Sequence, residues 1–179
     1  MNIRKLIMTV TVAVMTLATT TGFAKIAYDD LNLGGIYLGQ PMSEIITKFG
    51  QPKFKARTPD FPNGYYGSFN CGNFKLYIST TDSDNGVVFE LTANNDCQFV
   101  TKAGIGIGSS LASVKAAYGE PDLVNEKTDI VYLAQYTYFV KDDNKTKLSF
   151  LIRKDNGKVE GIYFVSLSPN RDGSTSQLL

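Results

Sequence analysis

A short block that occurs twice decides the fold of this chain. Residues 35–52 read GIYLGQPMSEIITKFGQP, and residues 104–121 read GIGIGSSLASVKAAYGEP. The blocks align without a gap, and the glycines and prolines match as Gly35/Gly104, Gly39/Gly108, Gly50/Gly119 and Pro52/Pro121. A match of this length, with its glycines and prolines in place, indicates a tandem repeat. The pattern therefore predicts two copies of one structural unit.

Each block predicts one short helix. In the first block, the apolar residues recur at the spacing of a single helical face: Met42, Ile45, Ile46 and Phe49. Pro41 suits the first helical position, and Gly50 suits the position just past the helix end. Leu111, Val114 and Tyr118 form the corresponding face in the second block. A helix of about ten residues is too short to be stable alone, so each must lie on an apolar surface.

The segments after each helix predict that surface as an antiparallel meander. Aromatic and β-branched runs predict six strands, at Tyr65–Phe69, Phe74–Thr80, Val87–Thr92, Ile130–Val140, Lys147–Arg153 and Val159–Leu167. Residues 53–63 are predicted to be a loop. The tripeptide Asp-Asn-Gly recurs at 84–86 and 155–157 and predicts a hairpin turn in each half. The fold class is therefore α+β: two tandem repeats, 25–97 and 98–168, each a short helical segment packed on a meander of about three to four strands.

A two-residue turn at Asn156-Gly157 would fix the register of the last hairpin. It would place Arg153 opposite Glu160, which is a favourable cross-strand pair. The same register predicts one shared sheet face for five residues: Leu148, Phe150, Ile152, Tyr163 and Val165.

The two ends of the chain are predicted to lie outside the folded body. Arg4 and Lys5 precede a mostly apolar run, Leu6–Ala18, and Ala24 ends a cleavage site, which is typical of a secretory signal peptide at 1–24. The alternative, a membrane anchor, would need about 20 apolar residues, and threonines interrupt the run. Residues 169–179 are polar and predict a flexible tail. The mature protein is expected to be secreted, or periplasmic and associated with the cell envelope, without stable membrane insertion.

Charge and composition exclude several function classes. Removing two basic residues with the signal leaves 16 basic residues (18 − 2) against 17 acidic ones, so nothing favours nucleic acid as a partner. The chain has no histidine, which removes Ser-His-Asp and Cys-His catalysis and the commonest zinc ligand. The glycines at 104–108 and the acidic turn at 82–86 lack the full spacing of a nucleotide loop or a calcium loop. We therefore expect no catalytic residue, cofactor or metal.

The chain has two cysteines, Cys71 and Cys97. In a secreted protein, an even number of cysteines favours a disulfide, and the hairpin centred near Asp84 would bring these two close together. Two free buried thiols are the alternative.

Three tyrosines of the second half, Tyr132, Tyr136 and Tyr138, alternate along one strand face, and aromatic residues lie at the equivalent place in the first half. Exposed tyrosine is enriched at protein interfaces because it offers a large apolar area and one hydroxyl. The candidate partner-binding residues are Tyr65, Tyr66, Phe69, Tyr132, Tyr136 and Tyr138. The alternative is that these rings pack beneath the helices.

The duplicated pattern resembles a known family. Each copy has a glycine, an aliphatic residue and a Gly-x-Pro end, and a meander follows. This duplicated pattern is similar to the β-lactamase-inhibitor-protein-like (BLIP-like) fold. Related single-copy domains occur in outer-membrane assembly lipoproteins of the SmpA/OmlA (BamE) type. The residues that match are Gly39, Ile45, Gly50, Pro52, Gly108, Val114, Gly119 and Pro121. The resemblance implies a sheet face that binds a protein. It does not imply β-lactamase inhibition, because no stretch matches the contact loops of those inhibitors.

These observations together predict a secreted, non-enzymatic binding protein that presents an aromatic sheet face to a protein or peptide. An envelope-associated structural or assembly factor is the alternative. An enzyme such as a carboxylate-dependent hydrolase is a third hypothesis, and it would need two acids that face each other across a cleft.

Overall fold

The computed structural model describes residues 26–52, 54–57, 65–71, 74–80, 86–94 and 97–166. The predicted signal peptide and the predicted tail lie outside these residues. The short elements before the first helix are η1 (Tyr28–Asp30), β1 (Asn32–Leu33) and β2 (Ile36–Tyr37). The rest of the first half is α1 (Met42–Phe49), β3 (Phe54–Arg57), β4 (Tyr65–Cys71), β5 (Phe74–Thr80) and β6 (Val88–Asn94). The second half has α2 (Leu111–Tyr118), β7 (Leu123–Asn125), β8 (Leu133–Val140), β9 (Asp143–Arg153) and β10 (Val159–Ser166).

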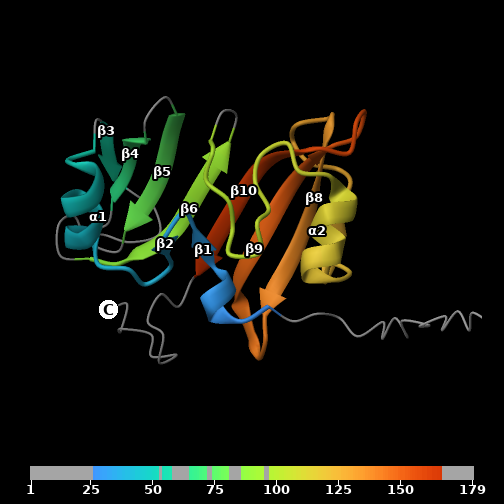
Figure 1. Cartoon of the computed structure of the whole chain (residues 1–179), viewed down its shortest axis with the longest axis horizontal. Helices are drawn as coiled ribbons and strands as arrows, with labels where there is room; N and C mark the ends of the chain where they lie inside the picture. The colour runs from blue at the N-terminus through green and yellow to red at the C-terminus, as the bar shows by residue number, and fades with distance from the viewer. Residues whose placement is uncertain are drawn as a thin grey trace, which may run out of the picture.

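The main sheet has eight antiparallel strands in the order β3-β4-β5-β6-β10-β9-β8-β7. Each half contributes a meander of four, and the halves meet where β6 pairs with β10. Figure 1 shows α1 at one end of the sheet and α2 at the other, with η1, β1, β2 and the segment after β6 between them. Within the described residues, the fold is therefore α+β, with two α-helices and a mostly antiparallel sheet.

Hydrogen bonds to the hairpins fix where each helix begins. In the first half, the Met42 N–H donates to the carbonyl of Gly86, and Gly39 and Val88 are also joined backbone to backbone. In the second half, the Leu111 N–H donates to the carbonyl of Gly157. The first N–H groups of a helix have no partner inside the helix, so the turn glycines of the hairpins satisfy one donor in each.

The two halves match in further detail. Gly50 and Gly119 end their helices with φ of 78° and 76°, and each donates its N–H to the carbonyl four residues earlier. The pairing of β5 with β6 shifts between Ser79 and Thr80, and the pairing of β9 with β10 shifts at the corresponding place, between Val159 and Gly161. The same backbone connections therefore recur along the chain.

One apolar core lies between the sheet and the helices. It takes Met42 and Ile45 from α1 and Val114 and Tyr118 from α2. The strands contribute a larger set to the same core: Phe69, Val88, Leu91, Ala93, Tyr138, Val140, Leu148, Phe150, Ile152, Val159, Ile162 and Phe164. The expected helical faces are confirmed at these positions, and burial of these faces compensates for the shortness of both helices.

Three expectations about the strands were wrong. Residues 54–57 form β3 rather than part of a loop, and Leu123–Asn125 form β7, which the pattern did not predict. The strand expected from Ile130 begins only at Leu133. Both unpredicted strands are short edge strands, and their pairing with β4 and β8 creates them more than their own composition does.

The expected register of the last hairpin was also wrong, by two residues next to the turn and by one residue beyond the irregularity between Val159 and Gly161. Arg153 donates its N–H to the carbonyl of Lys158, and the irregularity near Glu160 moves Tyr163 opposite Ser149. A shift of one residue reverses the face of every following side chain. Tyr163 and Val165 therefore lie on the opposite face from Leu148, Phe150 and Ile152, which are core residues.

The disulfide expected between Cys71 and Cys97 is not formed, because Cys97 is a free, buried thiol. The chain reverses just after Cys71, whose backbone pairs with Phe74, so Cys71 does not extend the β5–β6 hairpin as the expectation required. Burial raises the pKa of the Cys97 thiol, although a hydrogen bond with the backbone of Phe99 acts in the other direction.

Candidate functional site: an apolar loop beside the sheet edge

Two of the predicted partner-binding residues, Phe69 and Tyr138, are core residues instead. They occupy equivalent strand positions, and both are fully buried. The Tyr138 ring lies 5.6 Å from the ring of Tyr118 on α2, and its hydroxyl donates to the carbonyl of Gly119 at 3.2 Å. The alternating aromatic face is thus the face that the helices cover, and the expectation that it binds a partner was wrong at these two positions.

The other four predicted residues have different positions. Tyr136 is partly buried and packs against the core. Tyr65 and Tyr66 belong to β4, but their side chains lie outside the described part of the structure. Tyr132 lies just before β8 and is 50% exposed. Among the described members of the predicted set, Tyr132 is therefore the residue that is available to a partner.

Tyr132 ends a loop that displays apolar side chains in solvent. We call residues 126–132, between β7 and β8, the Tyr132 loop. Val131 is 83% exposed, and Ile130 beside it is 43% exposed. Leu123 and Val124 of the adjacent edge strand β7 are also exposed. Isolated exposed apolar residues are common, whereas three consecutive ones on a loop, next to an edge strand with two more, are typical of an interaction site.

Polar contacts with Lys154 hold this loop in place. The ammonium of Lys154 donates to the carbonyl of Glu126 at 2.6 Å and to that of Val131 at 3.0 Å, and the Lys154 N–H donates to the carbonyl of Tyr132. Inside the loop, the Thr128 hydroxyl contacts the carbonyls of Ile130 and Leu133. A loop fixed in this way loses less conformational entropy when a partner binds.

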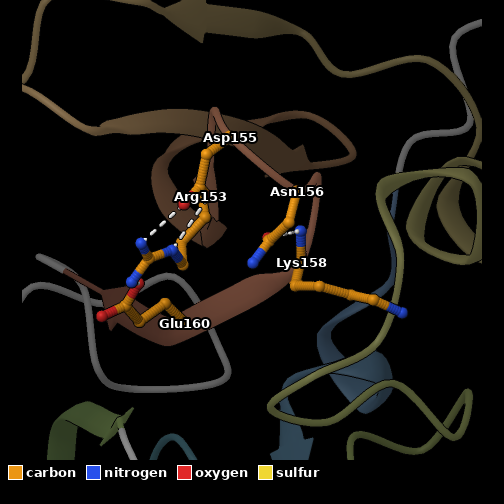
Figure 2. A network of polar contacts seen from close by, with 5 residues as sticks. All are labelled: Arg153, Asp155, Asn156, Lys158 and Glu160. Carbon is orange, nitrogen blue, oxygen red and sulfur yellow. Dashed lines mark hydrogen bonds and ion pairs between the residues drawn. The ribbon is translucent and has the colours of Figure 1, made fainter.

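Arg153 connects the loop to the β9–β10 hairpin. Figure 2 shows its guanidinium facing Asp155, with Glu160 close to its other side. Nε and Nη2 of Arg153 donate to the two carboxylate oxygens of Asp155 at 3.0 and 2.7 Å, and Nη1 lies 3.6 Å from Oε2 of Glu160. The guanidinium also lies 5.2 Å from the centre of the Tyr132 ring. The hydrogen bonds between Arg153 and Asp155 raise the pKa of the Arg153 guanidinium and lower the pKa of the Asp155 carboxyl. The opposite charge of each partner adds to both shifts.

The turn beneath Arg153 is itself closed by hydrogen bonds. The Lys158 N–H donates to Oδ1 of Asn156, as Figure 2 shows, and the Gly157 N–H donates to the carbonyl of Arg153. Gly157 has a φ of +66°, a conformation that glycine adopts readily. The turn therefore positions Arg153 against the Tyr132 ring.

The sheet face opposite the helices carries a second group of polar and aromatic residues. Thr137 and Ser149 share a hydrogen bond of 2.9 Å there, and both side chains are buried. Tyr163 lies over Gly161, since a Cβ at Gly161 would come within 2.9 Å of its ring. Burial raises the pKa of the Tyr163 phenol, and the charge of Glu90 raises it further. This face is continuous with the Tyr132 loop through Arg153 on β9.

A depression of about 460 Å³ lies near the other end of β8. Its lining residues are Asp122, Phe139, Val140, Asp142, Asp143 and Asn144. Two of its three carboxylates have protein partners: Asp122 accepts from the Phe139 N–H, and Asp143 accepts from the Tyr28 hydroxyl and the Lys145 N–H. Burial acts to raise the pKa of Asp143, but hydrogen bonds with Thr146 first, then with Lys145 and Tyr28, outweigh burial and lower the pKa.

The described residues contain no group of three or more Cys, Asp and Glu side chains placed to hold a metal ion. Within the same ranges, no helix is both long and apolar enough to cross a membrane. Two adjacent acidic residues, Asp29 and Asp30, lie in η1, and the Asp30 carboxylate accepts a hydrogen bond from the Ala27 N–H.

Comparisons with known proteins give a likeness of fold. No protein-family model matches the chain, and no curated protein matches its sequence. Among solved structures, a cysteine-rich secretory protein (SAV1118) from Staphylococcus aureus subsp. aureus Mu50 is similar in fold, with a TM-score of 0.54 and 16% sequence identity. The match covers 86% of this chain and 54% of that one, so this chain spans about half the length of its structural neighbour. At this identity, the likeness concerns the fold alone.

Most of the Tyr132 loop has only a weak signal in the sequence. Residues 130–133 are apolar without alternation, and this pattern predicts the start of a strand. The signal that does indicate a loop is the run of polar residues from Asn125 to Asp129, just before the apolar residues. The contribution of Lys154 depends on a contact across 23 to 28 residues, which no local pattern contains.

Proposed function

We propose that this protein is a non-enzymatic binding protein that takes a protein or peptide partner on the Tyr132 loop and the adjacent edge strand β7. The observation that carries the proposal is the exposure of Ile130, Val131 and Tyr132 on a loop that polar contacts hold in one conformation. Binding sites of high affinity commonly combine a rigid aromatic anchor with a surrounding apolar area.

Electrostatics supports a protein or peptide rather than a strongly charged partner. The region around the loop mixes both signs, with Lys154 and Arg153 beside Asp155 and Glu160. The chain as a whole is nearly neutral and has no histidine. A nucleic acid partner would need a basic surface, and most hydrolytic mechanisms would need an activated nucleophile or a pair of facing acids.

The proposal includes the origin and the location of the chain. The two halves are interpreted as copies of one unit, similar to the repeat of BLIP-like proteins. Support comes from the matching hydrogen bonds, Met42 to Gly86 and Leu111 to Gly157. The signal-like pattern of residues 1–24 supports a location of the mature chain, 25–179, outside the cytoplasm. A partner would then be an extracellular or envelope protein.

The test uses the mature chain as bait against the culture medium and envelope fraction of its own source. The variant is the double substitution Val131→Ser and Tyr132→Ala, which removes exposed side chains and leaves every core residue unchanged. Loss of an anchor of this kind costs on the order of 2 kcal/mol, about thirtyfold in affinity. We expect the variant to lose the retained partner, and titration calorimetry with that partner to give the fold-change.

The matched control is Val100→Ser. Val100 is also apolar and 48% exposed, but it belongs to the segment after β6 rather than to the loop. We expect Val100→Ser to keep the partner with its affinity unchanged. If the unmodified chain, the loop variant and the control retain the same proteins with equal affinity, the loop is not the binding surface.

A further inference from the structure

The β6–β10 junction, which we call the seam, has the register of a two-fold interface. Val88 and Val159 make the same backbone contacts in their halves, so positions on these strands correspond at an offset of 71 (159 − 88). At that offset, Thr92 corresponds to Tyr163 (163 − 92 = 71), and these two residues are direct partners in the seam. The two strands therefore pair symmetrically about one point.

The pairs on each side of that point follow the same symmetry. Gly161 pairs with Asn94, and Val165 pairs with Glu90. At the offset of 71, Gly161 corresponds to Glu90, and Val165 corresponds to Asn94. The pair Gly161–Asn94 is therefore the symmetry equivalent of the pair Val165–Glu90. An interface in which residue i meets j and j meets i is the isologous contact of a two-fold dimer. Here one chain supplies both sides.

Side chains in the seam distinguish its two strands. On the helix side, the small Ala93 of β6 lies opposite Ile162, and Leu91 lies opposite Phe164. Pairing β6 with another β6 would bring Ala93 against Leu91 twice and leave space unfilled. Pairing two copies of β10 would bring Ile162 against Phe164 twice and overfill the core. The packing therefore favours β6 with β10, whether or not both belong to one chain.

The segment that joins the halves is long enough for pairing between chains. From Asn94 at the end of β6 to Leu111 at the start of α2, 16 residues intervene (95–110), which span about 50 Å when extended. The segment holds three glycines, of which Gly104 and Gly108 have positive φ. The segment is attached at two places: the Gly34 N–H of the first half donates to the carbonyl of Val100, and the Gly108 N–H donates to the carbonyl of Val159 in the second half. Exchange with these contacts kept reroutes residues 101–107, which span about 20 Å when extended.

We propose that the seam also forms between two copies of this chain, with β6 of each pairing with β10 of the other, so that the halves are exchanged in a symmetric dimer. The exchanged dimer keeps every seam contact of the monomer, and the difference lies in the path of residues 95–110. Exchange of identical elements is a low-cost route to a dimer for this reason. The partner of this surface is a second copy of the protein, independent of the partner proposed for the Tyr132 loop.

The test uses cysteines at the centre of the seam, in the mature chain with Cys71→Ala and Cys97→Ala. One preparation carries Thr92→Cys and a second carries Tyr163→Cys. Directly opposed residues of antiparallel strands have Cα atoms within the range that a disulfide spans. The two preparations are mixed, refolded together at low and high protein concentration, oxidised and separated without reducing agent.

We expect a disulfide-linked dimer with one chain of each kind, at a fraction that rises with protein concentration. Thr92→Cys refolded alone is expected to give no linked dimer, because β6 does not pair with β6. The matched control mixes Glu90→Cys with Tyr163→Cys, which share a sheet face but lie two residues out of register, about 7 Å along the strand. That mixture is expected to stay unlinked.

A chain that carries both Thr92→Cys and Tyr163→Cys keeps the result interpretable. It forms an internal disulfide if the variants fold with the register described. An internal disulfide there, without linked dimers in the mixture, would overturn the exchange. If this chain forms a disulfide neither within one molecule nor between two, the register on which the exchange rests would be overturned.

Discussion

Tyr132 and Tyr138 show how much is decided at the scale of single residues. They are six residues apart on one segment, and the sequence pattern predicts the same partner-binding role for both. Tyr138 is fully buried against Tyr118 and Phe150, whereas Tyr132 lies in solvent under the guanidinium of Arg153. The first is a structural residue and the second is a candidate anchor, and only their surroundings separate the two roles.

Burial of Tyr138 predicts a dependence of stability on alkaline pH. Burial raises the pKa of its phenol, and the charges of Glu120 and Asp122 raise it further. The unfolded chain releases this proton from about pH 10, while the folded protein still holds it. The stabilisation from this group is therefore fully present below about pH 10 and is lost as pH rises towards the folded pKa.

The matched variant is Tyr138→Phe, with urea unfolding measured on both sides of about pH 10. Below that pH, the variant is expected to be less stable by about 1 kcal/mol, because it lacks the hydrogen bond to Gly119. Above it, the difference is expected to shrink, since phenylalanine has no proton to lose. Parallel stability curves for the two proteins would contradict the raised pKa.

At the scale of elements, the helices depend on contacts at their ends. Each has eight residues, too few for a stable isolated helix. The two N-termini are nevertheless satisfied differently. The hydroxyl of Ser110 accepts from the Ser113 N–H at 3.1 Å, whereas α1 follows Pro41 and has no side-chain cap.

We predict that Ser110→Ala destabilises the protein by about 1 kcal/mol, because it removes the side-chain cap of α2. Guanidinium-induced unfolding followed by circular dichroism measures the change. Ser113→Ala is the control: it removes a hydroxyl from the same turn but keeps the N–H that the cap satisfies. Equal losses in the two variants would show that the hydroxyl pair, rather than the cap, stabilises this helix end.

At the scale of the whole molecule, the two halves share one core and one sheet. The core cluster includes residues of both helices, and the sheet continues across the seam without a break. We therefore expect one cooperative unfolding transition for both halves, since neither helix covers a core of its own.

The substitutions Gly50→Ala and Gly119→Ala, one in each half, test whether the two halves unfold in one transition. Both glycines combine a φ near +77° with an extended ψ, a region that is essentially restricted to glycine, so each substitution is expected to cost about 1–3 kcal/mol. At Gly50 the cost would come from the backbone alone, because an added Cβ would meet nothing within 4 Å.

Denaturant unfolding of each glycine variant is compared with that of Gln51→Ala, an exposed neighbour expected to be neutral. Similar losses at Gly50 and Gly119 within a single transition are the expected result. Two separate transitions, each shifted by one variant only, would contradict a shared core.

Local sequence signals predicted the two α-helices, most strands of the described residues and the turn of the β9–β10 hairpin. These features depend on local chemistry: the spacing of Met42, Ile45 and Phe49, the positive φ at Gly50 and Gly119, and the Asp155-Asn156-Gly157 turn. Each of these signals lies within a few residues of the element that it specifies.

The tertiary structure alone decided the register, the edge strands and the site. The irregularity near Glu160 reversed the face of Tyr163, and pairing with β8 created β7. The helices covered the strand face on which Tyr138 lies, and Lys154 fixed the Tyr132 loop across more than twenty residues. Alternation along a strand gives two faces but does not say which one a helix will cover, because that depends on packing between distant segments.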